Sequence, residues 1–246
     1  MAYIGKSPTA APLTSSDVAD GIITNAKLAQ DIISADTALG ATPADTDEFL
    51  VSDAGTLKRV DYSYIKGGGQ WEHLLTQTAS SSSSLDFSST YITTTYLDYM
   101  LVFSGIKLSA DGLYPRLLFS VDNGSNYLDD YRNARMGLTD DNTGRNISQT
   151  GSAACYMVHE NSVGNSTGEG YNAVAFVFDP LKQSGTTDIY TMMRSLGSYT
   201  DTSGKIGTFS SANTSKVATA INNIRFDLNS GNITSGKASL YGRKIS

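Results

Sequence analysis

Apolar positions in residues 71–246 recur with the two-residue period of β-strands. In "INNIRFDLNSG", Ile224, Phe226 and Leu228 alternate with polar residues, which predicts a strand with one buried face. Within "YNAVAFVFDP", six successive residues are apolar, which predicts a central strand that is covered on both faces. Runs of strand length separated by Gly, Asn and Ser at short spacing are typical of an all-β sandwich or barrel.

The same pattern predicts where the individual strands lie. The predicted strands are residues 96–109, 113–122, 154–160, 171–180, 187–199, 205–212 and 221–231, followed by the closing "NITSGKASLYGRK". The low-complexity stretch "SSSSSLDFSS" (residues 80–89) is expected to be a surface loop between strands. A chain of this length buries enough apolar surface to form its own core.

The first 66 residues have a different pattern. Residues 1–20 are expected to be extended, because the residue before a proline avoids helical geometry and both Pro8 and Pro12 lie here. In residues 21–66, a broken apolar stripe includes a predicted short helix from Asn25 to about Ile32. Short isolated helices are marginal in water, so this stripe is expected to need a partner.

A small hairpin and a glycine linker follow the stripe. In "DEFLVSDAGTLKRVDYSYIKGGG", residues 49–51 are expected to form one strand, "DAG" the turn, and residues 57–65 a second extended stretch. Gly67-Gly68-Gly69 marks the clearest boundary. The predicted organisation is therefore an extended segment (1–20), a short segment with a hairpin (21–66), a linker (67–70) and a β domain (71–246).

Composition and charge exclude several classes of partner. The net charge is −6, and acidic residues outnumber basic ones both before and after the linker, which disfavours binding to nucleic acid or to an anionic membrane surface. Cys155 is the only cysteine, so no intrachain disulfide is expected. Neither a signal peptide nor a membrane span is expected, so the chain is predicted to be made in a cytoplasm without insertion into a membrane.

Several stretches resemble fibre or fibre-like virion proteins of tailed marine bacteriophages. "MAYIGKSP" resembles the openings of such proteins, and "LTSSDVADGIITNAKLAQDIISADTAL" and "DTDEFLVSDAGTLKRVDYSYIKG" are similar to their shaft modules. "INNIRFDLNSGNITSGKASLYGRK" resembles the last two strands of a C-terminal head domain, and "LLFSVDNGSNYLDDYR" resembles its strand-turn-strand. The resemblance implies a jelly-roll-like antiparallel β-sandwich head on an extended, partly helical N-terminal segment.

The resemblance also implies an assembly in the virion. It implies a homotrimer whose N-terminus attaches to other phage proteins, with an anchor formed by Tyr3, Ile4, Pro8 and Pro12. The expected trimerisation residues are Ile22, Ile23, Leu28, Ile32 and Ile33. The shaft is short compared with that of a long tail fibre, so a short tail fibre, a head fibre and a capsid decoration protein all remain open.

Receptor binding is the chemistry that the head sequence favours. Glycan recognition uses aromatic platforms with polar turn residues, and two loops combine them, "NGSNYLDDYRNA" and "HENSVGNSTGEGYN". The predicted contacts to a host surface polysaccharide are Asn126, Tyr127, Tyr131 and Tyr171. The alternative is that these tyrosines lie half-buried on the faces of the sandwich.

Catalytic, cofactor and metal sites are not expected. Cys155 and His159 share one face of a predicted strand, an arrangement that can activate a thiolate, but a buried cysteine is the commoner reading. Asp129-Asp130 and Asp140-Asp141-Asn142 offer oxygen ligands for calcium, but the second also reads as an ordinary turn. No carboxylate pair is selected for glycoside cleavage.

Three hypotheses follow from the sequence. The first is a homotrimeric tail fibre whose head binds a host glycan. The second is a head fibre or decoration protein without a specific receptor. The third is a free carbohydrate-binding protein or a glycan depolymerase.

Overall fold

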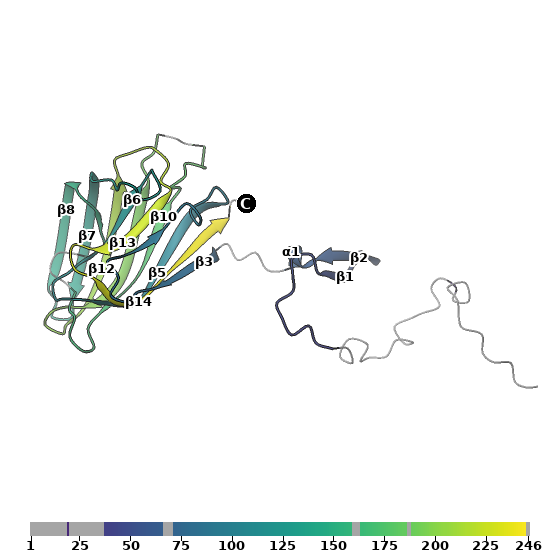
Figure 1. Ribbon diagram of the computed structural model, residues 1–246, viewed down its shortest axis with the longest axis horizontal. Helices are drawn as coiled ribbons and strands as arrows, with labels where there is room; N and C mark the ends of the chain where they lie inside the picture. The colour runs from purple at the N-terminus through teal and green to yellow at the C-terminus, as the bar shows by residue number, and fades with distance from the viewer. Residues whose placement is uncertain (1–18, 20–36, 66–70, 159–162, 186–187, 245–246) are drawn as a thin grey trace, which may run out of the picture. The chain divides into compact units, whose positions relative to one another are not determined.

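The chain divides into two compact units. The computed structural model describes residues 19, 37–65, 71–158, 163–185 and 188–244 (Figure 1). One unit comprises residues 1–68 and the other residues 69–246. The predicted anchor (1–20), the predicted helix at 25–32, the five predicted trimerisation residues and the predicted linker lie outside the described residues, Ala19 apart.

The first unit contains a β-hairpin. Strands β1 (Glu48–Asp53) and β2 (Thr56–Asp61) pair antiparallel, with Asp53 opposite Thr56. The two turn residues, Ala54 and Gly55, both have positive φ, as the tightest hairpin turns require. The hairpin expected from the sequence is therefore formed.

The second strand of the hairpin ends earlier than the sequence predicts. Residues 62–65 form the helical turn α1 (Tyr62–Ile65), so the predicted extended stretch to Ile65 is wrong beyond Asp61. Its partner strand begins at Glu48, opposite Asp61, and offers no residue for further pairing. The backbone amide of Tyr62 instead donates to the carbonyl of Asp47 at 2.7 Å, which turns the chain aside.

The second unit, here called the head, is an antiparallel β-sandwich, as the sequence predicts (Figure 1). The larger sheet has, in spatial order, β3 (Trp71–Thr78), β14 (Ile233–Lys244), β5 (Tyr96–Leu108), β10 (Tyr171–Phe178), β11 (Met192–Thr200), β12 (Ile206–Ser215), β7 (Tyr131–Thr139) and β8 (Gly144–Ser152). The smaller sheet has β4 (Ser84–Phe87), β13 (Asn223–Leu228), β6 (Pro115–Ser120) and β9 (Cys155–Tyr156). A jelly roll divides eight strands between two sheets, whereas these sheets have eight and four.

The core lies between the two sheets. Phe103 of β5 and Phe226 of β13 are both buried, and their ring centroids are 4.3 Å apart. Ile224 and Leu228 are buried beside Phe226, so the predicted apolar face of this strand is confirmed. Because one sheet supplies Phe103 and the other Phe226, this aromatic contact joins the two layers.

Some strand predictions are wrong. The predicted surface loop at 80–89 contains β4, whose Leu85 and Phe87 are buried in the core. Of the described residues 154–158 in the predicted strand 154–160, only the two of β9 form a strand, and of the described residues 188–199 in the predicted strand 187–199, the strand begins only at Met192. The sequence also failed to predict β3, β7 and β8, because few of their residues form apolar runs.

Strand β10 has the central place in the larger sheet that its apolar run predicts. It pairs with β5 on one side and β11 on the other. Tyr171, Ala173, Ala175 and Val177 face the core and are buried, whereas Phe178, on the opposite face, is 44% exposed. In the described residues the second face of β10 is thus not fully covered. Among these residues no helix has the length and apolar character that crossing a membrane requires.

Candidate functional site

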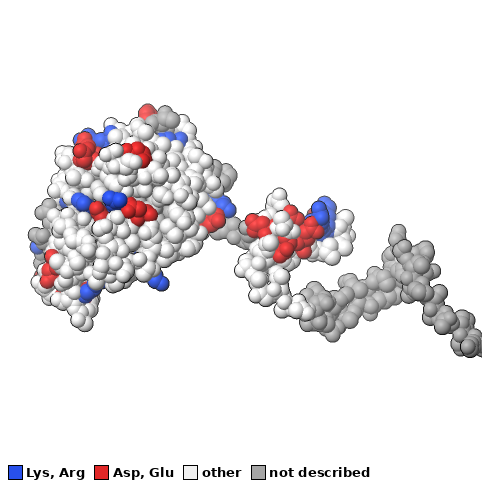
Figure 2. Space-filling view, in the orientation of Figure 1, with Lys and Arg blue, Asp and Glu red and all other residues white. Residues whose placement is uncertain are grey.

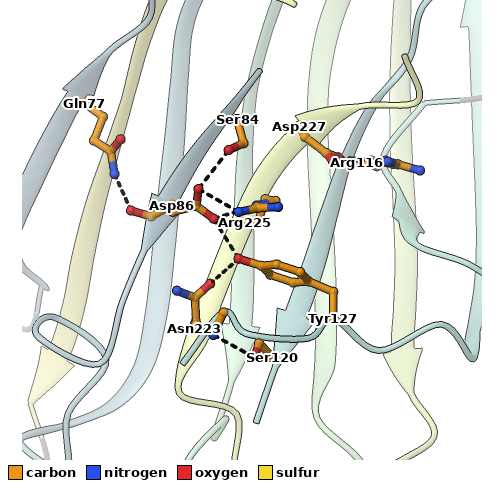
Figure 3. Close-up of polar contacts among 10 residues, drawn as sticks. Gln77, Ser84, Asp86, Arg116, Ser120, Tyr127, Asn223, Arg225 and Asp227 are labelled. Carbon is orange, nitrogen blue, oxygen red and sulfur yellow. Dashed lines mark hydrogen bonds and ion pairs between the residues drawn. The ribbon is translucent and has the colours of Figure 1, made fainter. Parts of the chain in front are cut away.

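A cluster of polar side chains covers the outer face of the smaller sheet, the face turned away from the core (Figure 3). It is here called the Tyr127 cluster and comprises Ser84, Asp86, Arg116, Tyr127, Asn223, Arg225 and Asp227. Residues that are directly opposite in an antiparallel pair lie on the same face. Arg225 is opposite Asp86, and Asp227 is opposite Arg116, so strand register alone brings both charge pairs together.

Both charge pairs have two parallel hydrogen bonds. Arg225 donates from Nε to Asp86 Oδ1 at 2.6 Å and from a terminal nitrogen to Oδ2 at 3.1 Å. Arg116 makes the same contacts to Asp227 at 2.7 and 3.1 Å. Fork-to-fork pairs of this kind fix the orientation of both partners. The outer face of the smaller sheet is therefore a rigid polar surface.

Tyr127 lies at the edge of this surface, in the loop between β6 and β7. Its hydroxyl oxygen is 2.8 Å from Asp86 Oδ1 and 3.1 Å from Asn223 Oδ1. The guanidinium carbon of Arg225 lies 4.2 Å from the centre of its ring, a cation–π contact. Burial and the hydrogen bond to Asp86 raise the pKa of Tyr127, so its hydroxyl remains a donor at neutral pH. The hydrogen bonds at the hydroxyl and the guanidinium of Arg225 over the ring face together fix the position of the Tyr127 side chain.

The two carboxylates of the cluster have opposite pKa shifts. Burial by itself raises the pKa of Asp86, but the hydrogen bonds from Arg225, Ser84 and Tyr127 outweigh it and hold the pKa below its ordinary value. Burial raises the pKa of Asp227 despite the opposing effect of Arg116. Each carboxylate forms an ion pair with a guanidinium. Such an arrangement suits recognition of a ligand by hydrogen bonds better than proton transfer to a substrate.

The loop that holds Tyr127 is fixed by Asp122. Asn126 donates to it from the backbone at 2.8 Å and from the side-chain amide at 2.7 Å, and these bonds lower the pKa of Asp122 to about 2. At Gly124, where φ is +90°, an added Cβ would lie 3.0 Å from the Tyr127 hydroxyl. Of the four predicted receptor contacts, Tyr127 is thus a member of the cluster, and Asn126 precedes it in the same loop.

The other two predicted receptor contacts are core residues. Tyr131 and Tyr171 are fully buried, so neither can touch a receptor, and their assignment is wrong. The Tyr131 hydroxyl accepts a hydrogen bond from the backbone amide of Phe119 at 2.9 Å, and the Tyr171 ring stacks on Phe209 with centroids 5.6 Å apart. Strand alternation turns both tyrosines towards the core.

The alternative chemistries gain no support from the geometry. Cys155 is fully buried, and burial raises the pKa of its thiol, so it is not a ready thiolate, while His159 lies outside the described residues. The segment Asp140–Asn142 forms the turn between β7 and β8, and Asp141 Oδ1 accepts from the backbone amide of Thr143 at 3.1 Å. In the parts of the chain that the structure describes, no three His, Cys, Asp or Glu residues are grouped as metal ligands.

The charged members of the cluster were missed from the sequence, although a signal was present. Arg225 and Asp227 occupy the polar alternate positions of "IRFDL", and Asp86 lies between two apolar residues in "LDF". Alternation therefore indicates that these charges share the solvent side of their strands. Their pairing depends on which strands are neighbours, and sequence spacing does not give this.

We expect Asp86→Asn to destabilise the head by about 1 kcal/mol at pH 7, because it weakens the charge-assisted bonds from Arg225 in a half-exposed site. The folded-state pKa of Asp86 lies below the unfolded value near 3.8. Its contribution is therefore complete above pH 3.8 and is lost as the pH falls through the folded-state pKa. Urea unfolding of wild type and variant at pH 7 and pH 3 measures this, and a difference that grows at pH 3 would contradict it.

No protein-family model matches the chain, and neither a curated protein nor a solved structure matches it.

Proposed function

We propose that the protein is a homotrimeric fibre of a phage virion, whose N-terminal segment trimerises and attaches to the particle and whose head binds a host surface glycan. The proposal rests on the sequence resemblance and on the physical character of the two units. The head has its own two-layer core. The described residues 37–65 of the N-terminal unit, by contrast, contain no buried residue.

The observation that carries the proposal is that no residue in the described stretch 37–65 is buried. Leu50 and Leu57, on one face of the hairpin, are 73% and 67% exposed, and Phe49 and Val51 on the other face are also exposed. An isolated two-stranded hairpin is marginal in water, and apolar side chains on both of its faces add to the cost. Burial against other copies, or against a virion protein, would cover the apolar side chains that are exposed in the described residues 37–65.

The glycan-binding role rests on the Tyr127 cluster. Its partly exposed Tyr ring and its amide, hydroxyl and charged groups are the kinds that bind sugar hydroxyls and pack against the apolar face of a sugar ring. Figure 2 shows that the charged groups on this side of the head gather in small mixed clusters within a largely uncharged surface. Such a surface favours a polar, neutral ligand over a strongly charged one.

Light scattering of the purified chain tests the assembly. We expect the full-length protein to have a mass close to three times 26.1 kDa, and residues 69–246 alone to dissociate to a monomer on dilution. The head has its own core, so it is expected to fold without the N-terminal unit. A full-length protein that is monomeric at every concentration would refute the trimer.

The second candidate is a head fibre or decoration protein without a receptor. It is favoured by the burial of Tyr131 and Tyr171, which removes half of the predicted receptor contacts. Binding of the protein to host cells separates it from the first candidate, because a decoration protein would not bind them.

A further inference from the structure

The larger sheet has an outer face, turned away from the smaller sheet, that is unusually apolar. Strand register places two rows of residues across five strands of this face, β5, β10, β11, β12 and β7. One row is Val102, Val174, Leu196, Ser210 and Met136, and the other is Met100, Phe176, Arg194, Ala212 and Ala134. Arg194 is the one charged residue of the ten.

This composition differs from that of a solvent-facing sheet. Antiparallel sheets with one wet face normally alternate apolar and polar residues, as the outer face of the smaller sheet does with its two ion pairs. On the larger sheet, Met136 is 60% exposed and Met192 is 53% exposed, and Leu138, Phe178 and Leu196 are also exposed. Contiguous exposed apolar side chains on a soluble domain indicate an interaction surface.

The outer face of the larger sheet is also not flat. A hollow of about 530 Å³ lies over β12, β7 and β8, and its lining includes the small residues Ala134, Ser148, Ser210 and Ala212. Met192 and Ile206, by contrast, are more than half exposed. Projecting side chains and a hollow on one face suit packing against an apolar surface of matching shape.

The size of the face suits an interface between protein domains. The five strands that carry the two rows are about 4.8 Å apart and about ten residues long, and at about 3.3 Å per residue they give a face of about 800 Å². A standard stable interface buries about 800 Å² on each partner. The face is therefore as large as one side of a standard interface, an area that the neighbouring heads of an assembly can share.

The chemistry of the face points to another copy of this chain as that partner. The two rows contain one charged residue, Arg194, so they provide little that would select a charged partner. The same face on a second copy of the chain is equally apolar and is therefore complementary to them. In the proposed trimer, which this step assumes, the N-terminal segments hold the heads at an effective concentration of about 1 mM, so that even a weak contact forms. The second apolar face of β10 would then be covered, as its sequence predicts.

We propose that the outer face of the larger sheet is the surface through which heads of neighbouring copies pack in the assembled protein. The contact includes Met136, Met192 and Leu196. It adds to the N-terminal contact and does not replace it. The heads would thus be arranged with their Tyr127 clusters turned outward, because these lie on the opposite sheet.

Methionine oxidation of the full-length protein by dilute hydrogen peroxide tests this surface. Met136 and Met192 are expected to oxidise about tenfold more slowly in the assembled wild type than in Leu196→Glu, which places a charge at the centre of the face. Met157 and Met193 are buried within the head and should oxidise slowly in both proteins. Val121→Glu, an equal change at an exposed residue of the loop after β6, is the matched control and should behave as wild type.

Light scattering on the same samples separates this inference from the proposed function. An oligomer in which Met136 and Met192 oxidise as fast as in Leu196→Glu would overturn the head contact and leave the fibre proposal intact. A monomer in which both residues are protected would mean that the chain's own N-terminal segment covers the face, which also overturns it. If the protein is a monomer and both methionines oxidise rapidly, both proposals fail. The rapid oxidation would refute the head contact, and the monomeric mass would refute the trimer.

Discussion

Full-length protein is expected to bind host cells about 10²–10⁴-fold more tightly than the isolated head, residues 69–246, at equal head concentration. In the proposed trimer, three heads are joined in one molecule. Once one head has bound a cell, binding of the second and third heads is therefore intramolecular. The gain needs no new contact to the glycan. The gain in affinity follows from joining the heads through the N-terminal segment. Of its described residues 37–65, none is buried within a single chain.

Flow cytometry with fluorescently labelled protein measures this difference as the concentration at half-saturation. Tyr127→Ala in the full-length chain should weaken binding, whereas Tyr190→Ala, which removes an exposed tyrosine outside the cluster, should not. Equal half-saturation for the head and the full-length chain would argue against a multivalent fibre. Failure of either protein to bind cells would instead favour the decoration protein.

The sequence predicted the fold class because the core strands β5, β10 and β13 follow simple apolar patterns. It failed on β7, where the usual pattern is reversed. Asn133 and Arg135 of this strand are buried, and Met136 is exposed on the opposite face. Asn133 donates to the carbonyl of Ala154 at 3.0 Å and Arg135 to that of Val158 at 2.8 Å, so backbone carbonyls bind polar side chains that pattern alone would place outside.

The candidate site was predictable only in part, because its members come from distant parts of the sequence. Asp86 and Arg225 are 139 residues apart and meet through strand register. Tyr131 and Tyr127 are four residues apart, but one lies in the core and the other at the surface, because Tyr131 begins a strand whose neighbours determine which way it faces. Composition identifies tyrosines as candidates and does not determine the direction of their side chains.

Phe226→Ala is expected to destabilise the head by about 3–5 kcal/mol, the usual cost of removing a buried aromatic ring. Phe226 is fully buried on β13, and its ring lies 4.3 Å from that of Phe103 on the opposite sheet. Its loss leaves a cavity at the contact between the two layers. The neighbouring strands β4 and β6 are hydrogen-bonded to β13 on either side and cannot readily move in to fill it.

Urea unfolding of the isolated head at low concentration gives the free energy directly, and the melting temperature should fall by about 10 °C. Phe178→Ala is the matched control, because it removes the same ring from the outer face, where Phe178 is 44% exposed, and should cost less than about 1 kcal/mol. If both variants lost similar stability, the outer face would already be covered in a single head, and the division into a buried inner face and an exposed outer face would be wrong. A large difference would support a core in which Phe226 of β13 packs between the two sheets, while Phe178 on the outer face of β10 contributes little to the stability of a single head.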